Sequence, residues 1–178
     1  MNKCLIYLLL FFITSCDSSL QMSRSDRAID KMIKNFAVKL SPYGFHLVGL
    51  GGGLDHQSKK HKKIDVILGT RKDISDINEA RELLVETIVE FLNYINTKAD
   101  IQEYLSTIPF AIENIHVSIL FEQSEPPNID HMFNCGKELC YFVKGNDPRG
   151  LSSEKVHEET FEEAKQILSE EGYYACSE

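Results

Sequence analysis

The sequence contains no tryptophan, few prolines and only one long apolar run, the nine residues from Leu5 to Ile13. A helix needs about 20 apolar residues to cross the hydrocarbon core of a bilayer, so we expect no permanent transmembrane span. The lack of tryptophan does not prevent a core, because ten phenylalanines and seven tyrosines accompany many isoleucines and leucines.

Common catalytic and nucleotide-binding motifs are also missing. No Gly-x-Ser-x-Gly motif of a serine hydrolase occurs. Gly49 and Gly51 begin like a dinucleotide fingerprint, but Leu54 stands where its third glycine belongs. At His157 the zincin pattern fails, because Phe161 replaces the second histidine. We therefore predict no catalytic residue, no cofactor and no metal site.

The first sixteen residues have the parts of a secretion signal: Lys3, the apolar run and small residues before a cysteine. The segment Ile13-Thr14-Ser15-Cys16 resembles the lipobox of bacterial lipoproteins. The resemblance implies a thioether-linked diacylglyceryl group on Cys16, cleavage after Ser15 and usually a further acyl chain on the new amino terminus. Two acyl chains give stable membrane anchoring. The alternative is an ordinary signal peptide, or a misread start, with a chance cysteine.

The leader predicts both the location and the organisation of the chain. We expect residues 1–15 to be a cleaved signal peptide, 16–22 a lipid anchor and tether, and 23–178 a single α+β domain. The predicted location is the bacterial cell envelope, where acyl chains on Cys16 make the membrane itself a partner. Asp17 matches the inner-membrane retention signal of enterobacterial lipoproteins, which favours the inner over the outer membrane.

The charge of the chain bears on its partners. A formal net charge of −8 argues against a broad nucleic-acid-binding surface, so we expect no nucleic acid partner. The only dense basic run consists of Lys59, Lys60, Lys62 and Lys63. On a lipid-anchored protein these lysines would contact anionic head groups, at about 1 kcal/mol each. The alternative is a solvated loop tip that keeps a sheet edge from pairing with other chains.

Apolar periodicity predicts an α+β fold. Capping residues start helices at Ser23, Asp76 and Thr160. Alternating residues predict strands at 45–50, 64–68, 115–121, 129–135 and 139–144, and a short edge strand ending at Val156. Residues 55–63 are expected to form a long, mobile hairpin tip. Short turns between strand pairs favour a mostly antiparallel sheet of about five strands, with helices packed on one face.

Three cysteines remain to be explained in the mature chain: Cys135, Cys140 and Cys176. Cys135 and Cys140 bracket a plausible hairpin turn, and facing residues on paired strands lie within disulfide range. Two buried free thiols are the alternative. A cysteine nucleophile assisted by His116 or His131 also stays open, although no spacing demands it.

The mature part suggests no specific activity. Its segments 23–30 and 157–164 resemble small uncharacterised lipoproteins of intracellular bacteria, which implies a shared fold and no assigned activity. The first hypothesis is a non-enzymatic binding or interaction module that presents a face to an envelope or host protein. The second is a membrane-anchored enzyme, such as a thiol-dependent hydrolase that uses Cys135 or Cys140.

Overall fold

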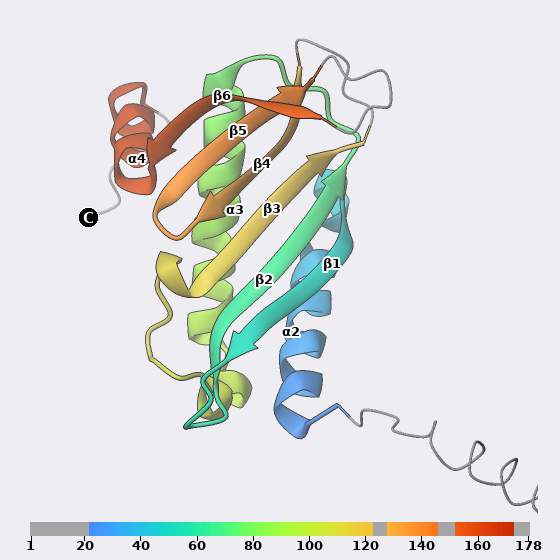
Figure 1. The fold of residues 1–178 in the computed structure, drawn as a ribbon, viewed down its shortest axis with the longest axis vertical. Coiled ribbons are helices and arrows are strands. Elements are labelled where there is room, and N and C mark those ends of the chain that lie inside the picture. Colours follow the sequence, from blue (N-terminus) through green and yellow to red (C-terminus); the bar gives the residue numbers. More distant parts are fainter. Residues whose placement is uncertain (1–21, 123–127, 146–151, 173–178) are drawn as a thin grey trace, which may run out of the picture.

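The computed structural model of the protein describes residues 22–122, 128–145 and 152–172 and contains one six-stranded sheet (Figure 1). Its strands lie in chain order: β1 (Phe45–Leu54), β2 (His61–Thr70), β3 (Ile115–Phe121), β4 (Ile129–Cys135), β5 (Glu138–Lys144) and β6 (Ser153–Thr160). Every neighbouring pair is antiparallel except β2 and β3. The predicted α+β class and mostly antiparallel sheet are confirmed, with six strands rather than about five.

The parallel pair of β2 and β3 was not predicted. Parallel neighbours need a long connection. Here that connection contains helix α3 (Ile77–Thr97) and the short 3-10 helices η2 (Ala99–Tyr104) and η3 (Ile112–Asn114). The expectation that short turns join the strand pairs is wrong at this point, because the central helix is itself the crossover.

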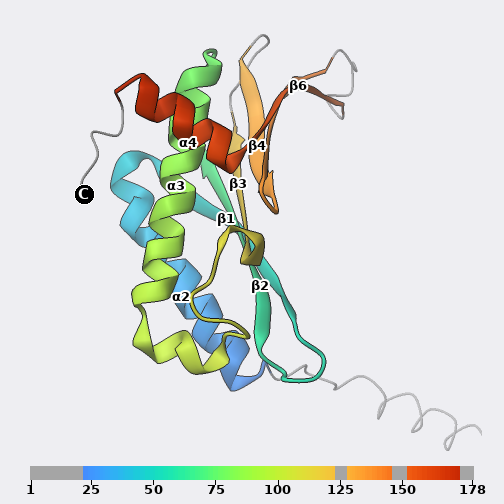
Figure 2. The same ribbon diagram turned by 90° about the vertical axis from the view of Figure 1, so that its left-hand side faces the viewer.

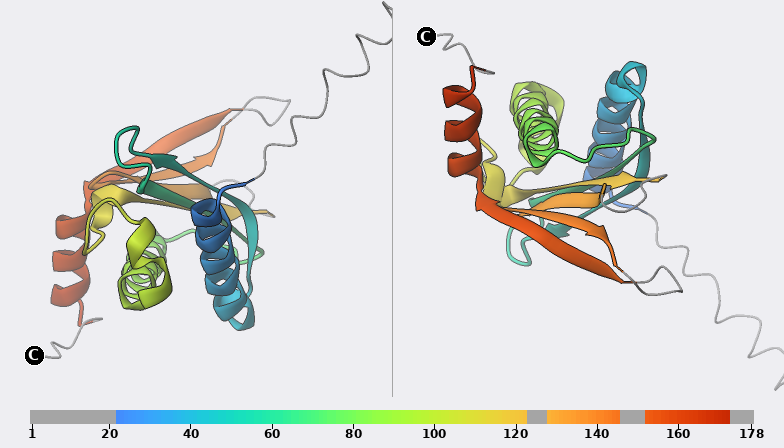
Figure 3. Two further views of the ribbon diagram at one scale, coloured as in Figure 1. Left: turned by 90° about the horizontal axis from the view of Figure 1, so that it is seen from below. Right: turned by 90° about the horizontal axis from the view of Figure 1, so that it is seen from above.

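Helices α2 (Arg24–Leu40), α3 and α4 (Phe161–Glu170) all cover the same face of the sheet, as predicted (Figures 2 and 3). The side chains of Ser23 and Thr160 accept hydrogen bonds from backbone N–H groups in the first turns of α2 and α4. Such caps satisfy donors that lack a helical partner, and each stabilises the fold by about 1 kcal/mol. No described element covers the opposite face.

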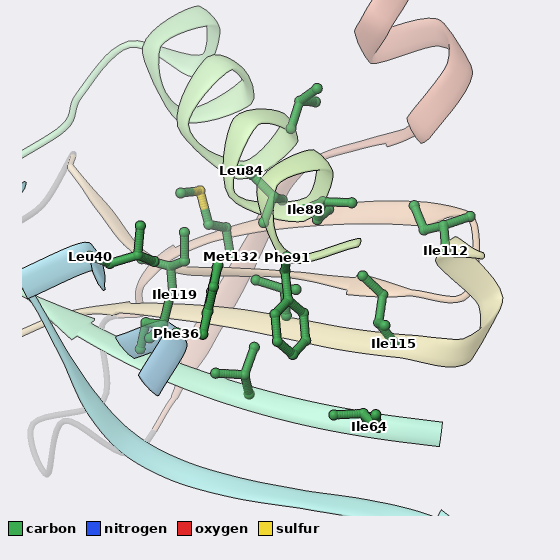
Figure 4. Close-up of a cluster of buried hydrophobic side chains, with 14 of the residues drawn as sticks. Phe36, Leu40, Ile64, Leu84, Ile88, Phe91, Ile112, Ile115, Ile119 and Met132 are labelled. Atoms are coloured by element: carbon green, nitrogen blue, oxygen red, sulfur yellow. The ribbon is translucent and has the colours of Figure 1, made fainter. Parts of the chain in front are cut away.

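The core fills the space between the helices and the sheet (Figure 4). Phe36 of α2 and Phe91 of α3 meet there, with their ring centroids 4.7 Å apart. Strands β2 and β3 supply every second side chain, because successive strand residues point to opposite faces. Fully buried members include Ile33, Ile64, Val66, Leu68, Leu84, Ile88, Ile95, Ile115, Val117 and Ile119.

The β1–β2 hairpin has longer strands and a shorter tip than predicted. The structure confines the loop to residues 55–60, so the glycine run continues β1 and two of the predicted tip lysines lie in β2. Asp55 holds the tip, since its carboxylate accepts hydrogen bonds from Gln57 N at 2.9 Å and Ser58 Oγ at 3.0 Å. These bonds, the Gln57 bond first, lower the pKa of Asp55.

Some predictions concern residues outside the described ranges. The signal peptide at 1–15, the lipidation of Cys16, the retention signal at Asp17 and the state of Cys176 all fall there. They stay predictions. Within the part of the chain that the structure describes, no helix is both long enough and apolar enough to cross a membrane.

Candidate binding surface

The uncovered face of the sheet, called the open face below, carries the side chains that point away from the helices. On the central strands these are Ile67, His116, Ser118, Leu120, His131, Phe133, Cys140 and Phe142. They alternate with core residues such as Val117, Met132 and Tyr141, which the helices bury completely. Parallel strands ordinarily have both faces covered. Among the described residues, only one face of the parallel pair of β2 and β3 is covered.

Four rings on β3, β4 and β5 form one group on the open face, called the ring cluster below: His116, His131, Phe133 and Phe142. The His131 and Phe142 rings stack with centroids 4.5 Å apart and an interplanar angle of 7°. Phe133 stacks on Phe142 at 5.4 Å, and His116 is tilted against Phe133 at 5.5 Å. All four side chains remain partly exposed. Part of this aromatic surface is therefore still in contact with water.

The histidines of the ring cluster have defined hydrogen-bond partners. Nδ1 of His116 lies 2.6 Å from the carbonyl oxygen of Asn134, and Nδ1 of His131 lies 3.1 Å from Asp130 Oδ2. A carbonyl oxygen can only accept, so Nδ1 of His116 carries the proton. In the neutral ring Nε2 is then a free acceptor. The cluster therefore combines ring surface with a fixed polar atom.

Asn134 fixes β3 against β4 beneath the ring cluster. The main-chain pairing of these strands covers only residues 118–120 of β3. Beyond these residues the fully buried side chain of Asn134 replaces main-chain pairing between the strands. Its Oδ1 accepts a hydrogen bond from Val117 N at 2.6 Å, and its Nδ2 donates to Ile115 O at 3.0 Å and Gly136 O at 3.1 Å. Sequence reasoning missed this residue, since a polar side chain near the end of a strand gives no sign of such long-range partners.

Cys135 and Cys140 do not face each other in the hairpin of β4 and β5. Glu138 stands opposite Cys135, and Phe133 stands opposite Cys140. The two cysteines are thus diagonal neighbours, and Cα atoms at that spacing lie about 7–8 Å apart, beyond the range a disulfide usually spans. The expected facing arrangement is wrong. Both residues are free thiols in the structure.

The surroundings of Cys140 disfavour a nucleophile. Its thiol donates a hydrogen bond to Glu158 Oε1 at an S···O distance of 3.6 Å. Burial, and then the Glu158 carboxylate, raise the pKa of Cys140. A nucleophilic cysteine needs the opposite, a lowered pKa next to a cation or a basic histidine. In the described ranges neither thiol is hydrogen-bonded to His116 or His131.

The described residues contain no group of three His, Cys, Asp or Glu side chains that could hold a metal ion. Comparison with protein families, curated proteins and solved structures finds no match to this chain. The ring cluster is therefore interpreted from its own geometry. From the sequence alone, His116 and His131 are expected only as possible helpers of a cysteine. The available signal was the presence of aromatic residues at Phe133 and Phe142, on the polar side of two alternating strands.

The predicted basic run is split by the structure. Lys59 and Lys60 are exposed in the hairpin tip, whereas Lys62 and Lys63 lie in β2. The buried His61 ring stands between the two pairs, with Nε2 3.3 Å from Asp26 Oδ1 on α2. The hairpin tip and the start of α2 therefore lie at the same end of the molecule (Figure 1).

A buried ion pair connects α3 to β6. Arg81 Nε donates to both carboxylate oxygens of Glu159 at 2.9 Å, and His157 Nε2 lies 3.5 Å from Glu159 Oε2. Tyr141 is fully buried, and burial followed by the Glu159 charge raises its pKa. Glu158 and Glu159 belong to β6 and therefore do not lie in the first turn of α4.

Proposed function

We propose that the protein is a lipid-anchored lipoprotein of the bacterial cell envelope whose folded domain is a non-enzymatic binding module. The open face is the surface through which it binds an envelope or host protein. The observation that carries this proposal is the ring cluster, exposed on a face that no described element covers. The lipobox sequence ending at Cys16 supports the anchor.

The open face offers a partner exposed aromatic surface. Aromatic rings supply large contact area with little conformational freedom to lose, and they are enriched where proteins bind each other. Ser118 in the centre of this face is 8 % exposed, so the surrounding side chains already exclude most water there. Aromatic rings grouped around a side chain that is shielded from water are typical of the few residues that contribute most of the binding energy of an interface.

The second candidate, a membrane-anchored thiol-dependent hydrolase, has less support. Its motive is the pair of free thiols on β4 and β5. The hydrogen bond from Cys140 to Glu158 and the raised pKa of that thiol oppose nucleophilic attack. The observations therefore favour the binding module.

Photo-crosslinking in intact cells tests the binding surface. Phe142 is replaced by benzoylphenylalanine, which keeps an aromatic ring at that position of the open face. The matched control carries the same residue at Tyr43, which is 66 % exposed in η1 (Ser41–Tyr43) at the end of α2. We expect a discrete protein adduct from position 142 and none from position 43. No adduct at 142, or the same adducts at both positions, would contradict the proposal.

Mass spectrometry of the amino-terminal peptide from cells tests the anchor independently. The expected product begins at Cys16 and carries the mass of a diacylglyceryl group, with or without a further acyl chain. A chain recovered with residues 1–15 intact and no acyl mass would refute the lipoprotein part while leaving the crosslinking result valid.

A further inference from the structure

Charge is distributed unevenly along the chain. Residues 22–63 contain nine Lys and Arg against three Asp and Glu, a net charge of +6, in a protein whose total is −8. Residues 64–178 contain nine Lys and Arg against 23 Asp and Glu, a net charge of −14. An asymmetry of this size points to a charged binding surface rather than to solubility alone.

The positive segment gathers its cations on α2. Arg24, Arg27, Lys31 and Lys34 are all exposed and recur at spacings of three and four residues, so they share one face of the helix. The opposite face of α2 is buried against the sheet. Within the described ranges no carboxylate forms an ion pair with any of the four. Lys39, by contrast, is paired with Glu90 at 2.7 Å.

The hairpin tip adds two further cations. Lys59 and Lys60 are exposed in the hairpin tip. The tip lies at the end of the molecule where α2 begins (Figures 1 and 2). Together with the four cations of α2 they are called the basic face below: Arg24, Arg27, Lys31, Lys34, Lys59 and Lys60.

The tether joins the domain on this same surface. Met22, the first described residue, lines a hollow of about 390 Å³ together with Arg27, Asp30, Lys31, Lys34 and Asn35. Cys16 precedes Met22 by six residues, which span at most roughly 22 Å when fully extended. An acyl anchor on Cys16 would therefore keep the start of α2 close to the bilayer surface.

We propose that the basic face docks on the phosphate head groups of an anionic phospholipid membrane, an inference that rests on the lipid anchor of the proposed function. The anchor supplies proximity, and the basic face supplies charge complementary to the bilayer. Each Lys or Arg near an anionic surface favours the docked state by about fivefold. The attraction is screened by salt, because the Debye length is about 8 Å at physiological ionic strength.

Lysine labelling of the anchored protein tests the docking. Full-length protein purified from membranes is reconstituted into phosphatidylcholine vesicles, with or without phosphatidylglycerol, and acetylated with an amine-reactive reagent. Mass spectrometry then reports each lysine separately. We expect Lys31, Lys34, Lys59 and Lys60 to be protected only when phosphatidylglycerol is present, with protection lost at high salt. Lys155 and Lys165, exposed on β6 and α4, are internal controls that should not change.

Charge reversal gives a second, matched test. The variant Lys31→Glu/Lys34→Glu should reduce docking on phosphatidylglycerol vesicles by about 25-fold or more, as the two lost cations predict. Lys155→Glu/Lys165→Glu changes the net charge by the same amount on the acidic side and should leave protection intact. All four side chains are exposed.

The outcomes separate docking from anchoring. Equal labelling in both vesicle types overturns the docking proposal, and protein that still floats with phosphatidylcholine vesicles shows that the anchor stands. Protein that does not float with phosphatidylcholine vesicles shows instead that the anchor is absent. Lysine labelling in the presence of phosphatidylglycerol vesicles then still tests docking of the basic face. Protection by soluble polyglutamate but not by anionic vesicles would assign the basic face to an acidic protein and overturn the proposal.

Discussion

Replacing Asn134 by alanine tests whether one buried amide holds the open face together. The substitution removes the acceptor for Val117 N at 2.6 Å and the donor to Ile115 O at 3.0 Å and Gly136 O at 3.1 Å. These bonds continue the β3–β4 ladder past the point where main-chain pairing stops. The backbone oxygen of Asn134 also receives the Nδ1–H of His116, so a local shift would disturb the ring cluster.

The magnitude follows from the burial of this site. Hydrogen bonds contribute about 1 kcal/mol each to net stability, so three give about 3 kcal/mol. Alanine also leaves the Val117 N–H buried without its acceptor, which costs about 1–3 kcal/mol more unless water enters. We therefore expect Asn134→Ala to lower the free energy of unfolding by about 3–6 kcal/mol. That is a large share of the roughly 5–15 kcal/mol typical of a domain.

Asn114→Ala is the matched control. Asn114 accepts from Ala111 N at 3.0 Å and donates to Lys62 O at 3.2 Å, but it is only half-buried. Water can replace both bonds, so its loss should cost about 1 kcal/mol or less. Urea unfolding followed by circular dichroism measures both variants, and hydrogen exchange should show faster opening at the Val117 amide. An Asn134→Ala variant no less stable than the Asn114→Ala control would refute the reasoning.

Three further predictions concern the other buried or reactive groups. Arg81→Met should lower the free energy of unfolding by about 3–5 kcal/mol, because it leaves the buried Glu159 carboxylate without its guanidinium partner. Adding Glu159→Leu should recover most of that loss in the same unfolding assay. Burial lowers the pKa of His61, so stability should be complete above its ordinary pKa of about 6.5 and fall as the pH drops below that value. His61→Gln should flatten this pH dependence in unfolding measurements, and an unchanged slope would show that another group titrates. At about pH 7 iodoacetamide should alkylate the exposed Cys135 much faster than Cys140, because Cys140 is buried and its pKa is raised. Equal alkylation rates, measured by mass spectrometry, would contradict the hydrogen bond between the buried Cys140 thiol and a carboxylate.

Local signals in the sequence were sufficient for the helices. The capping patterns at Ser23 and Thr160 are confirmed as capping boxes, and Asp76 caps α3. These features depend on residues within one helical turn of each other, so their physics can be read from a short segment. The prediction of α3 from its apolar periodicity is confirmed for the same reason, since the buried residues follow the period of the helix.

Long-range partners explain most of the errors. A charged residue in an amphipathic helix is expected on the polar side, yet Arg81 of α3 is buried because Glu159, 78 residues away, supplies its counter-charge. The glycine run of β1 was expected to end the strand, but pairing with β2 holds it extended as far as Leu54. Neither partner can be identified from local spacing. The parallel register of β2 and β3 escaped prediction likewise, because it is set by how α3 packs across the sheet.

The α2 cations of the basic face and the ring cluster of the open face lie on opposite sides of the sheet, and this geometry connects the two proposals. The buried side of α2 packs on the helix-covered face of the sheet (Figure 3), so the exposed cations of α2 lie on the side of the helix that faces away from the sheet. The ring cluster lies on the opposite, uncovered face. A domain docked through α2 would turn the ring cluster toward the aqueous compartment. A partner could then reach His131, Phe133 and Phe142 without competing with the bilayer. Adducts from position 142 should therefore be proteins rather than phospholipids, and a lipid adduct there would mean that the docked orientation is reversed.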